Sequence, residues 1–206
     1  INPTLAASGA SGYVFGYTES IKWDPTSRKL FFLGGDHGDN QQFVVFDSDT
    51  NTWSRQNTGA PLLGPTNHGY DHMAVDPTRG YFYSRYGYMS SGVNRYNITA
   101  QTWSALPNNN VLEQDYVQCC GGFDYSPELD GMLWFQGGVS STNGRLYLYR
   151  ESTNSWSALS GYLPAGDYHN FLEYNPIKKV AIFGGGNGNT NLYKVNGSGQ
   201  VSALSN

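Results

Sequence analysis

The chain has 206 residues, of which 14% are charged, and its formal net charge is −4 at pH 7. A chain of this length can bury a sizeable core within one domain. Its negative charge, without any cluster of Lys and Arg, excludes a surface that follows the phosphates of a nucleic acid or of anionic lipids. No apolar run approaches the ~20 residues that cross a bilayer. We therefore expect neither a nucleic-acid partner nor membrane insertion.

The composition favours strands over helices. The chain contains 26 Gly and 16 Tyr, and aromatic residues make up 15% of it, which suits short strands joined by tight turns. The abundance of Asn, Ser, Thr, Gly and Tyr is typical of an extracellular or virion surface. We therefore expect an all-β protein in one of those locations.

Four short runs of strand-forming residues recur four times, with a period near fifty residues. The first unit reads YTESIKW, KLFFLGG, FVVFDS and TWSRQ. The second reads HMAVD, YFYSRYG, VNRYN and TWSAL, and the third GFDYS, MLWFQGG, LYLYR and SWSAL. The fourth reads FLEYN, VAIFGGG, NLYKV and QVSAL. Four strands in each of four units are the pattern of β-propeller blades.

Two motifs mark equivalent places in these units. The end of the first run of each unit leads into a motif of an aromatic residue or Val, a polar residue and a proline. The prolines of this motif are Pro25, Pro77, Pro127 and Pro176. The fourth run opens on Trp53, Trp103 and Trp156, with Val201 in the same place in the last unit. Residues 1–206 are therefore expected to form a single propeller domain or propeller fragment. Its four blades of four antiparallel strands are predicted over about 13–60, 68–110, 119–162 and 167–206.

These motifs resemble kelch repeats, as found in galactose-oxidase-like propellers. The resemblance rests on the double glycines that close the second run, on an aromatic residue in the third run and on the Trp of the fourth. The double glycines are Gly34-Gly35, Gly137-Gly138 and Gly184-Gly185. The resemblance implies that these glycines let the backbone bend and that the Trp fills the space between neighbouring blades. Because kelch propellers resemble rings of six or seven blades, it also implies further blades or subunits of a larger assembly.

The unusual polar residues fall in loops that the propeller topology places on one face. In a blade, the loop into the first strand and the loop from the second to the third strand open on the same side. All four histidines and both cysteines of the chain lie in such loops: His37, His68, His72, His169, Cys119 and Cys120. Binding and catalytic residues are common on loops of a rigid scaffold. This face is therefore the candidate site.

The residues of this face support a binding site or a catalytic one. For binding, we expect ligand contacts from His37, His68, Tyr70, Asp71, Tyr86 and Asp167. For catalysis, His72 or His169 would act as base, Tyr168 as acid, and Arg85 would neutralise a substrate carboxylate. Those residue types resemble the sites of propeller lyases that cleave uronate polysaccharides, without a matched motif. A turn role is equally open for Asp71 and Asp167, since Asp often bonds the backbone two residues on.

Metal and disulfide chemistry are secondary expectations. His68 and His72 could hold a divalent metal, because imidazole and carboxylate are good ligands, but the sequence indicates no cofactor with confidence. The copper site of galactose oxidase has no matching spacing here. Cys119 and Cys120 could form a strained vicinal disulfide or remain as two thiols in a turn.

The sequence thus favours a recognition module over an enzyme. We expect a kelch-type propeller that binds a glycan or a partner protein through one loop face, as an adhesin does, since aromatic rings stack on sugars while polar side chains bond their hydroxyls. A polysaccharide lyase or other carbohydrate-active enzyme is the second hypothesis. An architectural propeller within a larger assembly is the third.

Overall fold

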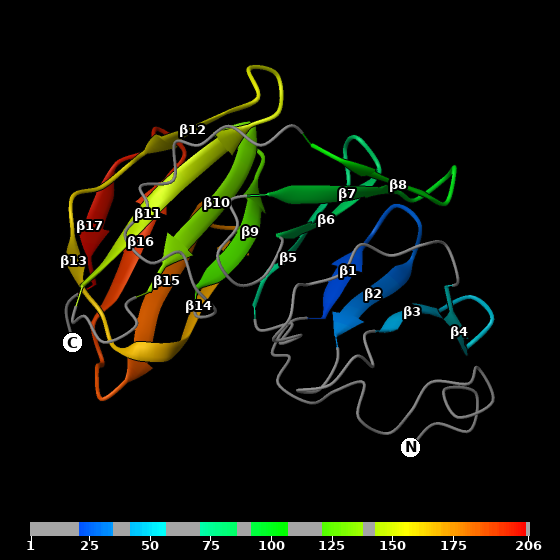
Figure 1. The fold of residues 1–206 in the computed structure, drawn as a ribbon, viewed down its shortest axis with the longest axis horizontal. Coiled ribbons are helices and arrows are strands. Elements are labelled where there is room, and N and C mark those ends of the chain that lie inside the picture. The colour runs from blue at the N-terminus through cyan, green and yellow to red at the C-terminus, as the bar shows by residue number, and fades with distance from the viewer. Residues whose placement is uncertain are drawn as a thin grey trace. The chain divides into compact units, whose positions relative to one another are not determined.

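The computed structural model describes residues 21–34, 42–56, 71–85, 92–106, 121–137 and 143–204. Throughout these ranges the regular elements are strands, which pair into antiparallel sheets (Figure 1). The same residues contain no helix long and apolar enough to cross a membrane. The chain divides into two compact units, the first holding two sheets and the second the other two. The expected all-β class with four propeller blades is confirmed.

The first unit contains blades one and two. Blade one has the strand order β1-β2-β3-β4, with β1 at Lys22–Asp24, β2 at Lys29–Gly34, β3 at Gln42–Asp47 and β4 at Thr52–Arg55. Blade two has the order β5-β6-β7-β8, with β5 at Met73–Asp76, β6 at Tyr81–Arg85, β7 at Val93–Asn97 and β8 at Thr102–Ala105. Each strand thus pairs with the one before it in the chain.

The second unit contains blades three and four. Blade three consists of β9 at Gly122–Ser126, β10 at Gly131–Gln136, β11 at Asn143–Arg150 and β12 at Ser155–Ala158. Blade four consists of β14 at Asp167–Asn175, β15 at Val180–Asn187, β16 at Leu192–Asn196 and β17 at Val201–Ala203. A short strand, β13 at Leu163–Pro164, pairs with the start of β11. Strand β13 is not among the strands expected from the sequence.

The polar residue before three of the four repeated prolines shapes the turn between the first two strands. The carboxylate of Asp24 accepts hydrogen bonds from the backbone N–H groups of Thr26 and Ser27, at 3.1 and 3.0 Å. Asp76 in blade two and Asn175 in blade four accept the equivalent pair of bonds. Short polar side chains that bond the backbone two residues on favour such turns. This bond explains why a polar residue recurs before the proline.

A left-handed backbone residue ends each of these turns, and a second one precedes each fourth strand. The first set is Arg28, Gly80, Asp130 and Lys179, with φ between 49° and 70°. The second set is Asn51, Gln101, Asn154 and Gly199, with φ between 46° and 82°. Because the left-handed conformation costs most residues about 1–2 kcal/mol, its recurrence in all four blades shows that the turns have a common geometry. The fifty-residue period is therefore a repeat of structure as well as of sequence.

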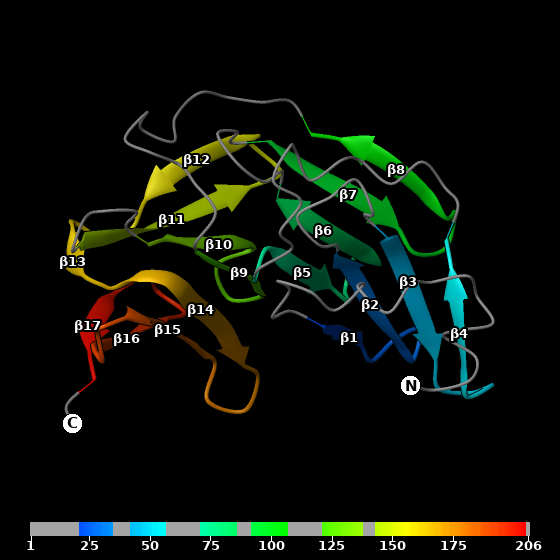
Figure 2. The same cartoon turned by 60° about the horizontal axis from the view of Figure 1, so that its bottom comes forward.

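The core of the first unit lies between its two blades, which are side by side in Figure 2. Phe31, Leu33, Phe43 and Val45 of blade one pack against Met73, Val75, Phe82 and Tyr96 of blade two, with Trp103 partly buried beside them. The ring of Trp103 meets that of Phe43 in the neighbouring blade edge to face, at 5.1 Å between centroids. The predicted role of this Trp between blades is confirmed.

The second unit has a matching core between blades three and four. Its buried residues include Leu133, Phe135, Leu146 and Leu148 of blade three with Leu172, Phe183, Tyr193 and Val195 of blade four. Val201, in the place of the Trp, is partly buried against the same core. Polar contacts also cross between these blades. A carboxylate oxygen of Asp124 accepts a bond from the Tyr174 N–H at 2.9 Å, and the Tyr174 hydroxyl donates to Glu128 at 2.5 Å.

Candidate functional site

Six of the predicted site residues are among those that the structure describes. Asp71, His72 and Arg85 lie in the first unit, whereas Asp167, Tyr168 and His169 lie in the second. The remaining predicted residues, His37, His68, Tyr70, Tyr86, Cys119 and Cys120, lie outside the described residues. The two described groups are therefore considered separately, each within its own unit.

Tyr168 and His169 form a bulge in β14. Asp167 pairs with Asn187 and Asn170 pairs with Gly185, so that two residues of β14 face one residue of β15. Both bulged residues are left-handed, with φ of 54° at Tyr168 and 49° at His169. The sequence indicated a loop here, but β14 begins at Asp167 and extends through the bulge. A bulge inserts an extra residue without ending the strand, and bulges often re-aim a side chain.

The side chain of Asn170 stabilises the bulge through hydrogen bonds to the neighbouring backbone. It is 1% exposed, and its Nδ2 donates hydrogen bonds to the carbonyl oxygens of Gly166 at 3.2 Å and Gly185 at 2.9 Å. The N–H of Gly166 also bonds the carbonyl of Gly185, at 2.9 Å. Two consecutive left-handed residues carry strain of order 1–3 kcal/mol each, which persists only where the surroundings fix the backbone. Asn170 provides that fixation.

Glycines of β15 make room for this arrangement. Gly184, Gly185 and Gly186 all have positive φ, between 78° and 129°. A Cβ atom on Gly186 would lie 2.5 Å from Nδ2 of Asn170 and 2.5 Å from the Gly166 carbonyl oxygen. Gly184 and Gly185 thus adopt backbone angles that residues with a side chain rarely reach. The third glycine, Gly186, is the one on which the bulge depends, because no larger residue fits there.

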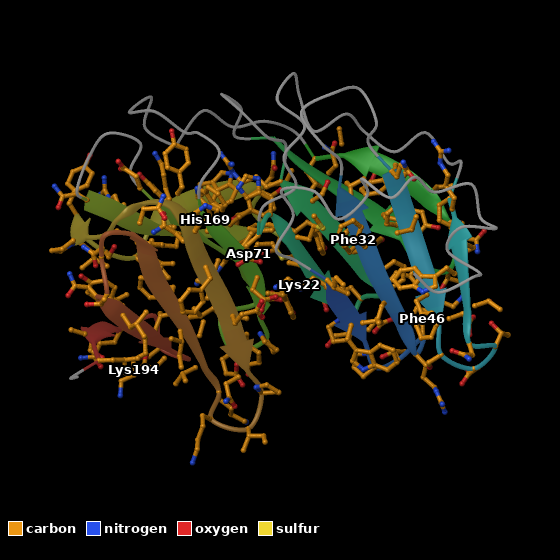
Figure 3. The ribbon with its side chains drawn as sticks, turned by 90° about the horizontal axis from the view of Figure 1, so that it is seen from below. Lys22, Phe32, Phe46, Asp71, His169 and Lys194 are labelled. Carbon is orange, nitrogen blue, oxygen red and sulfur yellow. The ribbon has the colours of Figure 1, made fainter. Side chains whose placement is uncertain are left out.

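The bulge directs two ring-bearing side chains to solvent. Tyr168 is 41% exposed and His169 is also exposed. Figure 3 labels His169 near the start of β14. A further exposed ring, Tyr162, lies just before β13 and is 58% exposed. The guanidinium of Arg145 lies 5.5 Å from its ring centre, and Arg145 Nε donates to the Ser160 carbonyl at 3.0 Å.

The antiparallel strand order places these rings at the same end of blades three and four. Strand β11 begins, and β12 ends, at the end of blade three where β14 begins in blade four. Tyr162 and Arg145 therefore belong to the same end of the second unit as Tyr168 and His169. The sequence analysis did not identify Tyr162 or Arg145. The spacing of Tyr162 after the Trp156 motif offered the only signal.

The first unit contains a buried ion pair at the end of blade two where β5 begins. Lys22 Nζ of β1 lies 3.5 Å from Asp71 Oδ1, just before β5, and the two side chains are 7% and 4% exposed (Figure 3). Charges are rarely buried unless they are paired, because burial removes their hydration. The pair links the innermost strands of blades one and two. The sequence analysis missed Lys22, since no local pattern reveals a partner in another blade.

His72, just before β5, and Arg85, at the end of β6, are neighbours and are fully buried. The Arg85 N–H donates to the His72 carbonyl at 2.9 Å, and both residues are 0% exposed. Arg85 occupies the place of Leu33 in blade one and Phe135 in blade three, both core residues. Burial lowers the pKa of the Arg85 guanidinium from its ordinary 12.5 to about 9. A cation in place of a core residue marks this end of blade two as unusual.

Asp167 lies at the start of β14, beside the bulge. Asp167 is half-buried, and its Oδ1 has no hydrogen-bond partner among the residues that the structure describes. The described ranges also contain no group of three His, Cys, Asp or Glu side chains that could hold a metal ion. The described part of the bulge site therefore presents rings and hydrogen-bonding groups rather than a ligand set.

Comparisons with known proteins identify the fold and nothing finer. No known protein family and no curated protein matches the sequence. Among solved structures, the chain is similar to a protein of unknown function from Bacteroides thetaiotaomicron VPI-5482, with a TM-score of 0.59 and 13% identity over 94% of this chain and 44% of that one. It is also similar to TolB from Acinetobacter baumannii, with a TM-score of 0.58 and 12% identity over 90% and 43%.

A third similar structure is an auxiliary nutrient binding protein from Bacteroides ovatus ATCC 8483, with a TM-score of 0.60, 11% identity, and coverage of 94% of this chain and 43% of that one. The chain thus spans less than half the length of these structures. At such low identity the likeness shows the fold alone. Together with the blades described above, it defines the class of the protein as a β-propeller.

Proposed function

We propose that this protein is a kelch-type recognition module that binds a glycan at the end of blade four where β14 begins. The observation that carries this proposal is the bulge at Tyr168 and His169, where a strained backbone presents an exposed ring and an imidazole side by side in sequence. Strained residues are concentrated at binding and active sites, where the surrounding structure holds them.

The chemistry of this end suits a sugar. An exposed tyrosine ring can cover the apolar face of a pyranose, while His169 and Asp167 can bond its hydroxyls. Tyr162 supplies a second exposed ring at the same end of the unit, and Arg145 over that ring is a cation able to contact a carboxylate of an acidic sugar. An exposed Tyr with adjacent polar groups therefore suits a flat, hydroxylated ligand.

The location and wider assembly are part of the same proposal. A glycan-binding role fits an extracellular or virion surface, as the composition suggests. Further blades or subunits would supply the remainder of a larger propeller, in line with similar structures of more than twice the length.

Binding to a panel of polysaccharides tests the proposal. The panel should contain neutral polymers and the acidic polymers alginate and pectate. The unmodified chain should bind at least one polymer, and Tyr168→Ala should lose that binding. Ile177→Ala is the matched control, because Ile177 is 86% exposed on the turn at the other end of the same blade. Equal binding by the Tyr168→Ala variant and the unmodified chain would show that the bulge does not bind the polymer.

The same incubation separates binding from lyase chemistry. A lyase that cleaves uronate polysaccharides leaves an unsaturated product that absorbs ultraviolet light, whereas a recognition module leaves the polymer intact. We expect bound polymer and no rise in absorbance. A rise that disappears in His169→Ala would instead establish the enzyme.

A further inference from the structure

A groove of about 160 Å³ lies between blades one and two, at the end of the first unit where β1 turns into β2. Its floor is formed by the buried side chains of Phe31, Val45 and Tyr96. Its walls come mainly from the outer strand of blade one and the turn between β7 and β8. The polar lining residues are Lys29, Asp47, Thr50, Thr52, Ser54, Gln56 and Gln101.

The groove is polar because blade one departs from the repeat at its outer strand. The N–H of Gln56 bonds the carbonyl of Phe43 at 2.8 Å, and Leu106, Leu159 and Leu204 make the equivalent bond in the other three blades. Gln56 therefore stands where each other blade has a leucine. In the second unit Leu159 packs against the core between the blades, and so does Leu129, whose counterpart in blade one is Ser27. Blade one thus carries two polar residues where blade three carries two apolar ones.

The walls of the groove combine donors and acceptors in a fixed arrangement. Thr52, Ser54 and Gln56 alternate along the outer strand, so their side chains share one face of it. Thr50 and Thr52 share a hydrogen bond of 2.7 Å, and Gln56 Nε2 donates to Ser54 Oγ at 2.8 Å. These contacts orient the side chains before any ligand is present, which lowers the entropy lost on binding.

The charges of the groove balance. Lys29 Nζ lies 3.5 Å from Asp47 Oδ2, and both side chains are about one third exposed. The turn N–H groups of Asp49 and Thr50 also donate to Asp47, at 2.9 and 3.1 Å, and these backbone bonds lower the pKa of its carboxyl. The groove therefore offers one cation, one anion and several groups that both donate and accept. A neutral, hydroxyl-rich ligand matches such a lining better than an anion or a hydrocarbon does.

We propose that this groove binds a single neutral sugar unit. The volume is below the ~300–1,000 Å³ of pockets that enclose drug-sized ligands, so the groove suits one pyranose ring and not an oligosaccharide. The hydroxyl groups of Thr52 and Ser54 and the carboxamides of Gln56 and Gln101 bond the hydroxyls of the sugar. The rings of the floor are almost completely buried, so they close the groove from below and offer little surface for stacking. This site belongs to the first unit and does not depend on the bulge of blade four.

The test is a titration of the isotope-labelled chain with glucose, galactose, mannose and N-acetylglucosamine, followed through the backbone amide resonances. We expect at least one sugar to shift the amides of Thr50, Thr52, Ser54, Gln56 and Gln101, with a dissociation constant of about 1 mM or below. Gln56→Leu should weaken this binding at least about tenfold, because it replaces the carboxamide that lines the groove with the leucine of the other blades. Since that leucine is compatible with the repeat, the variant should fold.

Ser157→Ala is the matched control, since Ser157 takes in blade three the place of Ser54 in blade one. It should leave the titration unchanged. Tyr168→Ala should also leave it unchanged, even though that variant loses polysaccharide binding at blade four, so the two sites fail independently. The proposal is overturned if no sugar shifts the amides of this groove, or if Gln56→Leu binds as tightly as the unmodified chain.

Discussion

Gly186 and Asn170 fit together across β14 and β15, because the missing side chain of the glycine leaves the space that the Asn170 amide occupies. A Cβ atom on Gly186 would come within 2.5 Å of Asn170 Nδ2, at a backbone φ of 97°. The amide in turn bonds the carbonyls of Gly166 and Gly185. The pair therefore fixes the backbone that carries Tyr168 and His169.

Gly186→Ala should lower both stability and polysaccharide binding. The new methyl group displaces Asn170, and the alanine backbone must keep a φ that is unfavourable for it. We therefore expect a loss of about 2–4 kcal/mol in the free energy of unfolding. Gly188→Ala is the control, because Gly188 has a φ of 71° but nothing within 4 Å of a Cβ atom. It should cost only about 1 kcal/mol. Urea unfolding measures both values, and equal losses would show that Asn170 does not need the glycine.

His169→Gly should raise stability. Glycine adopts a left-handed backbone without steric cost, so removing the strain at a φ of 49° should increase the free energy of unfolding by about 1 kcal/mol. Lys179→Gly, at a φ of 54° on an exposed turn of the same blade, provides the reference. A gain in Lys179→Gly without one in His169→Gly would indicate that the imidazole itself holds the bulge. Thermal and urea unfolding decide the matter.

Lys22→Met should destabilise the first unit strongly. It leaves Asp71 buried without the cation that lies 3.5 Å away, and breaking a buried pair in this way costs about 3–5 kcal/mol. Lys29→Met breaks a pair of the same length with Asp47, but those side chains are 32% and 30% exposed, so its cost should stay below about 1 kcal/mol. Similar losses in the two variants would contradict the buried role of Lys22.

Tyr174→Phe should alter the response of the protein to alkali. Burial, together with the bond to Glu128, raises the pKa of the Tyr174 hydroxyl above its ordinary 10.0. A group whose pKa is raised on folding contributes stability below its unfolded pKa and loses that contribution as pH rises through the folded value. The unmodified chain should therefore lose more stability than Tyr174→Phe above pH 10. Parallel unfolding curves for the two proteins across that range would exclude the contribution.

Much of the fold could be predicted from the sequence because the repeat is enforced by local chemistry. The runs VNRYN and GFDYS coincide with β7 and β9, and most other strands differ from their predicted runs by one or two residues at an end. Asp24, Asp76 and Asn175 bond the turn backbone within two or three residues, so their effect is visible in a short window of sequence.

The candidate site was less predictable because it depends on contacts between distant residues. Tyr168 and His169 could be identified by residue type, but the bulge that exposes them requires Gly186, which lies in another strand. Likewise, Lys22 pairs with Asp71 across two blades, and the groove beside Gln56 becomes evident only when four outer strands are compared. Sequence patterns report period and turn chemistry, whereas side-chain contacts between strands follow from the fold.

The decisive experiment is a crystal structure of the chain with a bound oligosaccharide, taken from the polymer that it binds best. We expect a pyranose ring over the exposed face of Tyr168, with His169 or Asp167 in hydrogen-bonding contact with its hydroxyls. An oligosaccharide bound elsewhere on the protein, with the Tyr168 and His169 bulge bare, would contradict it.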